Sequence, residues 1–323
     1  MAVKALISTL EDEILDPEEE TFFLFSHEIP SSNLGFIDPK ATDLSLTLAG
    51  RDFTIHQSPT VLSSTRAGGT TGAVLWKITP LFATYLSSPT SPFTSIFRPS
   101  STVLELGCGI SPLTALLLAP RISRYILTDQ PYVSRMVHQN LEANPLPKAG
   151  GSSKASSSRR RKAAPANDAK SEGGAGVGSG VIEFRPLDWE LDTPTPDLTG
   201  SPQARSFDAV VCCDCIYNEA LVAPLVSTTA DLARLRLRTQ EDETEAHDSA
   251  GHSGDDSADR SEPCVCIVAQ QLRSPDVFEE WVKAFHRDFR VWRVPDELLP
   301  EGLRIESGFV VHVGILRESE VEF

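Results

Sequence analysis

The sequence lacks any apolar run close to the roughly 20 residues that a membrane-spanning helix needs. It also lacks a secretory signal, because residues 1–10 form a short segment that is followed at once by Glu11, Asp12 and Glu13. Six cysteines without such a signal favour a reducing compartment. We therefore expect a monomeric protein of the cytoplasm, with the nucleus as the alternative, and no membrane partner.

Positive charge is scarce as well. The chain has 29 Lys and Arg residues against 45 Asp and Glu residues, which gives a formal net charge of −16 at pH 7. This balance argues against strong binding to a nucleic-acid backbone, although the basic cluster at 159–162 leaves room for a local contact. The overall charge suits a basic protein partner better.

Several common catalytic patterns are missing. No Gly-Lys-Ser/Thr follows the glycine-rich run at 68–72, so it is not a phosphate-binding loop, and no Gly-x-Ser-x-Gly marks a hydrolase. Five of the six cysteines fall on or beside two expected neighbouring strands: Cys212, Cys213, Cys215, Cys264 and Cys266. Cysteine in a buried strand behaves as a small hydrophobic residue, and the histidines lack metal-ligand spacing, so we predict no metal site.

A strand that runs into a glycine turn is the most informative stretch. Residues 103–106 include Glu105 in an otherwise apolar run, Gly107, Cys108 and Gly109 follow, and a helix is expected over 113–118. Glycine lets the backbone turn sharply and approach a ligand closely, and Glu105 places a carboxylate beside the turn. Strand, glycine turn and helix in this order predict a binding site for a nucleoside-type ligand.

The residues around this turn narrow the ligand. A nicotinamide-dinucleotide fingerprint requires a third glycine three residues after Gly109, but that residue is Pro112. The next strand, expected over 125–128, ends before Asp129, about 20 residues past the glycines, where a carboxylate can bind a ribose diol. Asp129 fits NAD and S-adenosylmethionine equally well, so the cofactor stays open on these residues alone.

Strands and helices alternate along the rest of the chain, which predicts an α/β fold with a Rossmann-like, mostly parallel seven-stranded sheet. Strands are expected at 103–106, 125–128, 181–184, 209–213, 264–270, 289–294 and 309–316, and helices at 132–143, 219–236 and 276–287. The last two strands have no convincing helix between them, which indicates an antiparallel C-terminal edge. Residues 102–323 form this domain, and residues 1–101 form an N-terminal extension with a hairpin of strands 44–48 and 53–57.

Two segments interrupt the pattern. Residues 148–180 are rich in serine, glycine and alanine, and residues 239–262 are strongly acidic, so we predict two disordered insertions. They are either solvated loops or segments that recognise a partner. The basic cluster at 159–162 is also compatible with a nuclear-localisation signal.

Two further motifs follow the third and fourth strands of the sheet. Asp188 and Trp189 come after the third strand, and the motif from Asp214 to Tyr217 follows the fourth. Ligands bind at the carboxyl ends of such strands, so these side chains should meet the glycine turn at one edge of the sheet. Trp189 there either lies against a purine ring, with Asp188 at its amino edge, or anchors a loop.

These motifs, in this order and spacing, resemble the seven-strand S-adenosylmethionine-dependent protein lysine methyltransferases: Glu105-x-Gly-x-Gly, Asp129, Asp188-Trp189 and Asp214-x-x-Tyr217. Trp76, upstream of the glycine turn, resembles a tryptophan that packs on the cofactor in that family. Within these enzymes the chain is similar to the fungal ribosomal lysine methyltransferase 5 family, which also has the segment at 55–59. The resemblance covers residues 44–143 and 181–316.

The resemblance implies a pocket for S-adenosyl-L-methionine. Its glycine turn would bend around the methionine part, Asp129 would hold the ribose, Asp188 and Trp189 would read the adenine, and Trp76 would cover the cofactor. The full set of expected cofactor-binding residues is Trp76, Glu105, Gly107, Cys108, Gly109, Asp129, Asp188, Trp189 and Cys213.

The resemblance also implies the reaction. Asp214 would orient the amine of a substrate lysine and Tyr217 would flank it, while the alternative for Asp214 is a cap on the following helix. The substrate would be a basic large-subunit ribosomal protein, an L1-stalk protein by resemblance. Two other functions stay open: an RNA amino-group methyltransferase, which would more naturally show Asn/Asp-Pro-Pro-Tyr/Phe, and a noncatalytic binding module with charged insertions.

Overall fold

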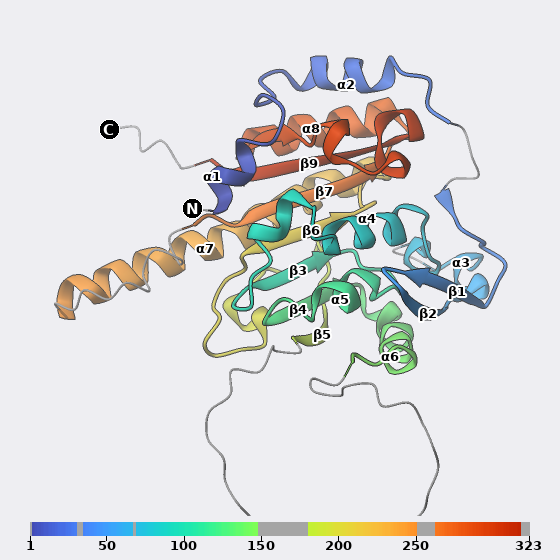
Figure 1. The fold of residues 1–323 in the computed structure, drawn as a ribbon, viewed down its shortest axis with the longest axis horizontal. Helices are drawn as coiled ribbons and strands as arrows, with labels where there is room; N and C mark the ends of the chain where they lie inside the picture. Colours follow the sequence, from blue (N-terminus) through green and yellow to red (C-terminus); the bar gives the residue numbers. More distant parts are fainter. Residues whose placement is uncertain (1, 31–34, 67–68, 148–179, 251–261, 318–323) are drawn as a thin grey trace, which may run out of the picture.

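A seven-stranded sheet forms the centre of the computed structural model, which describes residues 2–30, 35–66, 69–147, 180–250 and 262–317 (Figure 1). Its strands are β3 (Thr102–Leu106), β4 (Arg124–Asp129), β5 (Val181–Pro186), β6 (Ala209–Cys213), β7 (Val265–Gln271), β8 (Phe289–Arg293) and β9 (Phe309–Leu316). They lie in the order β5-β4-β3-β6-β7-β9-β8; the first five pair in parallel, and β9 is antiparallel to both neighbours. The predicted Rossmann-like fold and antiparallel C-terminal edge are confirmed, with β9 inserted between β7 and β8.

Helices cover both faces of the sheet, so the central parallel strands are buried throughout and mostly apolar. Every residue of β3, β6 and β7 is buried. On β3, Val103 packs in one apolar cluster with α4 (Ile78–Ser87), α5 (Leu113–Leu118) and α6 (Ser134–Ala143). The next residue, Leu104, packs in a second cluster with α7 (Val222–Ala250) and α8 (Pro275–Asp288). Within the residues described, no helix combines the length and apolarity that crossing a membrane requires.

The expected N-terminal hairpin is present. Strands β1 (Asp43–Leu48) and β2 (Arg51–His56) pair antiparallel, and the short helix α3 (Pro59–Leu62) follows them. Ala49 and Gly50 join the strands with φ angles of 49° and 76°. A two-residue hairpin turn of this kind needs positive φ at both positions, which explains the glycine.

The segment of residues 2–30 contacts the edge of the sheet formed by β8, which the sequence did not predict. Helices α1 (Ala2–Ile7) and α2 (Pro17–Phe25) flank an extended segment in which Glu13 bridges Trp292 of β8, and Ile14 N donates to Val291 O at 2.8 Å (Figure 1). This segment covers part of an edge strand that would otherwise expose unpaired backbone groups.

The prediction for the second insertion is wrong over its first half. Helix α7 continues to Ala250, so residues 239–250 are helical (Figure 1). The reason is composition: glutamate, glutamine and alanine in this stretch are good helix formers, so a helix that starts in the core can extend past it. Residues 251–261 of that insertion and residues 148–179 of the first insertion lie outside the described residues.

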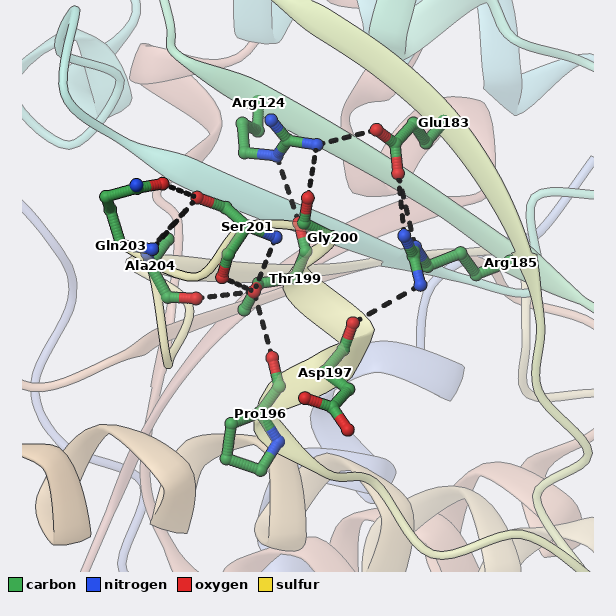
Figure 2. A network of polar contacts seen from close by, with 10 residues as sticks. All are labelled: Arg124, Glu183, Arg185, Pro196, Asp197, Thr199, Gly200, Ser201, Gln203 and Ala204. Carbon is green, nitrogen blue, oxygen red and sulfur yellow. Dashed lines mark hydrogen bonds and ion pairs between the residues drawn. The ribbon is translucent and has the colours of Figure 1, made fainter.

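A polar network holds the chain between β5 and β6 (Figure 2). Arg124 at the start of β4 donates from Nη2 to Glu183 Oε1 of β5 at 2.6 Å and from Nε to Thr199 O at 3.0 Å. Gly200 follows with a φ of 68°, and a Cβ there would lie 2.5 Å from Glu183 Oε2. This network anchors the loop between β5 and β6, which also contains Trp189.

Candidate functional site

A cavity that is open to solvent lies at the carboxyl ends of β3, β4, β5 and β6. All eleven residues that the sequence singled out line it: Trp76, Glu105, Gly107, Cys108, Gly109, Asp129, Asp188, Trp189, Cys213, Asp214 and Tyr217. They come together because parallel strands present their carboxyl ends at one edge. Their individual roles remain predictions.

The turn at the end of β3 requires glycine at two positions. Gly107 and Gly109 have φ angles of 67° and 55°, in the left-handed region that other residues rarely adopt. A Cβ on Gly107 would lie 2.8 Å from Cys215 Sγ and 3.1 Å from the Trp189 ring. A Cβ on Gly109 would lie 3.1 Å from Gly72 O, so both positions also lack space for a side chain.

The glycine-rich segment upstream crosses directly over this turn. Ile110 N donates to Gly72 O at 2.9 Å, and Gly72 N donates to the Tyr132 hydroxyl at 3.1 Å. Trp76 Nε1 donates to Thr71 O at 3.1 Å, which fixes the indole beside the cavity. Two parts of the chain about 40 residues apart therefore form one wall.

Side chains from the hairpin region fix this wall in place. Gln57, which follows β2, accepts from Leu75 N at 3.1 Å and donates to Ala41 O at 2.6 Å. On α6, Asn140 donates to Ile110 O at 2.8 Å and accepts from His56 N at 2.7 Å. The sequence indicated residues 55–59 only through family resemblance; these contacts give them a physical role in supporting the segment before Trp76.

One buried and one half-buried carboxyl group lie beside the glycine turn. Burial raises the pKa of Glu105 to about 8, even though the Tyr125 hydroxyl donates to its Oε2 at 2.8 Å. Burial also raises the pKa of Asp129 to about 6, against the opposing effect of N–H groups of Gly109 and Gln130, which donate at 2.9 and 2.7 Å. Both groups would become more acidic next to a positively charged ligand.

The charge of the cavity wall is one-sided. Five of the residues that line it carry carboxyl groups: Glu105, Asp129, Asp188, Glu190 and Asp214. In the described part of the chain, none of the lining residues is lysine, arginine or histidine. Arg273 compensates the charge of Asp214, and burial raises the pKa of Glu105, so the negative charge near pH 7 comes mainly from the other three carboxylates. Such a wall suits a cationic ligand without phosphates, and disfavours a pyrophosphate.

The pair Asp188-Trp189 forms its own turn after β5. Asp188 Oδ1 accepts from Glu190 N at 3.0 Å, and Asp188 N donates to Asp192 Oδ2 at 2.8 Å. The Trp189 ring is half-buried and stands against Gly107. The turn thus presents one aromatic face and one carboxylate to the cavity, which is compatible with the predicted adenine contact.

Asp214 is held in place more tightly than the sequence indicated. Its backbone has a φ of 62°, and its side chain is only 3% exposed. Arg273 Nη1 and Nη2 donate to Oδ1 and Oδ2 at 2.7 and 2.6 Å, and Gln270 Nε2 donates to Oδ1 at 3.0 Å. The alternative that Asp214 caps the following helix is wrong, because Asn218 provides that cap by accepting from Ala220 N at 3.2 Å.

Tyr217 lies at the mouth of the cavity with 43% of its surface exposed. Tyr132 and Cys215 are among the lining residues that the sequence did not single out. Tyr132 lies under the Arg66 guanidinium at 4.2 Å, and Cys215 Sγ packs on the glycine turn. Tyr132 follows Asp129 by three residues, the same spacing as in Asp214-x-x-Tyr217, and that repetition was the available signal.

The thiols in the cavity wall behave as apolar groups. Burial raises the pKa of the Cys108 and Cys213 thiols, so they stay protonated near neutral pH and are poor nucleophiles. Among the described residues, no group of three histidine, cysteine or acidic side chains could hold a metal ion.

The sheet order, the glycine turn and the acidic residues at the strand ends define the fold of the Rossmann-like methyltransferases. The resemblance to the fungal ribosomal lysine N-methyltransferase 5 family is confirmed: the protein of that name from Zygosaccharomyces rouxii is 29% identical over 72% of this chain and 70% of its own length. Proteins of the same name from Saccharomyces cerevisiae strains are 26% identical. No protein-family model matches the chain.

One relative is named as a deaminase and not as a methyltransferase. A Schizosaccharomyces pombe protein named diaminohydroxyphosphoribosylamino-pyrimidine deaminase is 32% identical over 85% of this chain, and the chain spans 52% of that protein. The sequence contains neither His-x-Glu nor Pro-Cys-x-x-Cys, the zinc signature of nucleobase deaminases, so that name gives no activity to this chain.

Among solved structures, the 16S rRNA N2 G1207 methyltransferase of T. thermophilus, in complex with AdoMet and guanosine, aligns with a TM-score of 0.43. The identity is 14%, over 85% of this chain and 50% of that one, which is too distant to indicate a substrate.

Proposed function

We propose that the cavity binds S-adenosyl-L-methionine and that the chain transfers its methyl group to a lysine side chain of a basic protein. The observation that carries this proposal is the acidic cavity wall around a glycine turn, with no lysine, arginine or histidine among the described lining residues. S-adenosylmethionine has a positive sulfonium, a positive ammonium, one carboxylate and no phosphate, so its net positive charge fits this wall. The name shared by several relatives supports lysine as the acceptor.

The residues present could hold each part of this cofactor. The turn at Gly107 to Gly109 would receive the methionine part, with Glu105 near its ammonium. Asp129 would accept hydrogen bonds from the ribose, since a carboxylate that already accepts two backbone N–H groups still has lone pairs available. Trp189 would lie against the adenine and Trp76 would form the outer wall.

When bound, the cofactor supplies a methyl group on a positively charged sulfur, which keeps the bonding electron pair when the methyl leaves. The protein residues then have to align the lysine and exclude water. Tyr217 and Trp76 would flank the amine at the cavity mouth. A lysine has an ordinary pKa of about 10.4 and must lose its proton before it attacks, and removal from water lowers that pKa.

The substrate class follows from charge and from the relatives. A chain with a net charge of −16 attracts basic proteins, and ribosomal proteins are basic. The relatives named ribosomal lysine N-methyltransferase 5 make a ribosomal protein the first choice. Such a substrate would be met in the cytoplasm or in the nucleus.

The test is to incubate the purified chain with cofactor that carries a labelled methyl group, together with total ribosomal proteins and ribosomal RNA. We expect label in protein, on lysine by mass spectrometry. Label in RNA would support the amino-group methyltransferase instead. Cofactor binding without any transfer would support the noncatalytic module, and both of these results would overturn the proposal.

A further inference from the structure

The carboxylate of Asp214 has little capacity left for a substrate. Its oxygens accept four hydrogen bonds: two from Arg273, one from Gln270 Nε2, and one from Gln271 N at 3.3 Å. A carboxylate offers about four lone-pair positions. Three of these bonds go to Oδ1 and one goes to Oδ2, so only Oδ2 keeps a free lone-pair position, and a side chain that is only 3% exposed gives a substrate little access to it.

Arg273 connects this carboxylate to the outer wall of the cavity. The same guanidinium that binds Asp214 lies 5.1 Å from the Trp76 ring and donates from Nη2 to Gln271 Oε1 at 2.9 Å. Phe36 packs against Trp76, with ring centroids 4.5 Å apart. The indole is therefore in contact with a cation from the loop after β7 and an aromatic ring from the N-terminal extension.

Residues 35–37, which we name the strap, lie directly on this cluster. Phe36 bridges Trp76 in antiparallel fashion, and Lys77 N donates to Gly35 O at 2.8 Å. Gly35 has a φ of 92°, and a Cβ there would lie 2.1 Å from Gln271 Oε1 and 2.7 Å from Arg273 Nη2. The strap can approach so closely only because this residue is glycine.

We propose that Asp214 is a positioning residue for methyl transfer: through Arg273 it holds Trp76 and the strap as the outer wall that aligns the lysine, and it does not itself bind the amine. This inference rests on the proposed function. There is a chemical reason for the arrangement. An unpaired carboxylate beside the amine would favour the charged ammonium, which cannot attack, whereas the Arg273 pair is neutral overall.

A double-mutant cycle tests the pairing. Asp214→Asn and Arg273→Met should each lower kcat/KM for the protein substrate by on the order of tenfold. The kcat/KM of the double variant should be no lower than that of the less active single variant, because the two residues act as one unit. Cofactor Kd should change less than about threefold, which also shows that the variants fold. Arg273→Lys should restore activity only in part, since lysine cannot bind a carboxylate with two donors.

A matched control is the Arg234–Asp288 ion pair between α7 and α8, with a separation of 3.1 Å and no part in the cavity. Asp288→Asn should leave kcat/KM unchanged. The proposal is overturned if Asp214→Asn abolishes turnover while Arg273→Met either keeps full activity or has a lower KM for the lysine substrate. In that case Asp214 would bind the amine itself.

Two further readouts separate positioning from direct contact. Arg273→Met should speed amide hydrogen exchange at Lys77 and Ile37, whose N–H groups join the strap to the Trp76 segment, while exchange in β3 stays the same. The pH dependence of kcat/KM should keep its midpoint in Asp214→Asn, and a shifted midpoint would contradict the proposal. If the wild type transfers no methyl group to protein, the proposed function fails, but the exchange experiment still decides whether Arg273 holds the strap.

Discussion

The side-chain amide of Asn140 on α6 hydrogen-bonds both backbone polar groups of His56 on β2, as a neighbouring strand would. Its Oδ1 accepts from His56 N at 2.7 Å and its Nδ2 donates to His56 O at 2.9 Å. The same Nδ2 also donates to Ile110 O, just past the glycine turn. One buried asparagine thus joins the hairpin to the wall of the cavity.

Replacing this residue should affect both stability and the site. Asn140→Ala leaves buried backbone groups without partners and should cost roughly 2 to 3 kcal/mol of unfolding free energy, measured in urea. The substitution should also weaken cofactor binding, because the carbonyl oxygen of Ile110 loses the hydrogen bond from Asn140. Asn144→Ala is the matched control: Asn144 pairs with Thr54 N and O in the same way but does not reach the turn. Equal loss of cofactor affinity in both variants would contradict this account.

Cofactor affinity should depend on pH through Glu105. Its pKa of about 8 means that the free protein holds this group mostly neutral at pH 7, whereas a cationic ligand favours the carboxylate. Affinity should therefore rise as the pH goes from about 6 to above 8, and binding at pH 7 should release a proton. Calorimetry in two buffers with different heats of ionisation measures that proton. Glu105→Gln should bind more weakly and lose this pH dependence, and an unchanged slope would contradict the assignment.

The elements around the cavity could be predicted because their signals are local. Gly107 and Gly109 stand in a glycine turn after an apolar run, and the acidic residues follow strand ends, so topology alone brings them to one edge. The partner of Asp214 was not predicted, although Arg273 follows the end of β7, the strand next to β6. The signal was present, but a single arginine in a loop has many uses, and only the three-dimensional structure shows which carboxylate it binds.

Other features had no local signal at all. Glu20 and His312 are 292 residues apart, and nothing near either residue indicates that the N-terminal segment returns to the last strands. The extent of α7 differs from the prediction for another reason: two local signals conflict, because acidic composition predicts disorder while the helix propensity of the same residues continues the helix.

The glycine turn offers a clean comparison of space against backbone strain. Gly107→Ala and Gly50→Ala both place alanine at positive φ, 67° and 76°, so the strain in the backbone is similar. Only at Gly107 would the new methyl group lie 2.8 Å from a neighbouring side-chain atom; no described atom lies within 4 Å of a Cβ at Gly50. Both variants should lose about 1 to 2 kcal/mol of stability, and only Gly107→Ala should also lose cofactor binding by more than about tenfold. Binding that is equally weak in both would mean that the effect is a general loss of folding.

The buried ion pair at the far edge of the sheet should give stability that disappears in acid. Glu20 on α2 accepts from Arg293 at 2.7 Å and is 2.8 Å from His312 Nε2. Burial alone would raise the pKa of Glu20, but the bonds and charges of His312 and Arg293 outweigh it and the pKa is lowered from 4.5. The contribution is therefore present above about pH 4.5 and is lost as the pH falls through the lowered folded-state pKa.

Glu20→Gln should cost about 3 kcal/mol near neutral pH, because a buried cation loses its partner. The difference from wild type, followed by urea unfolding at several pH values, should shrink below about pH 4.5. Glu19→Gln on the same helix is the control, since Glu19 is exposed and should change stability by less than about 0.5 kcal/mol. A Glu20→Gln difference that stays constant down to pH 3 would show that lost packing, and not the lost charge, is the cause.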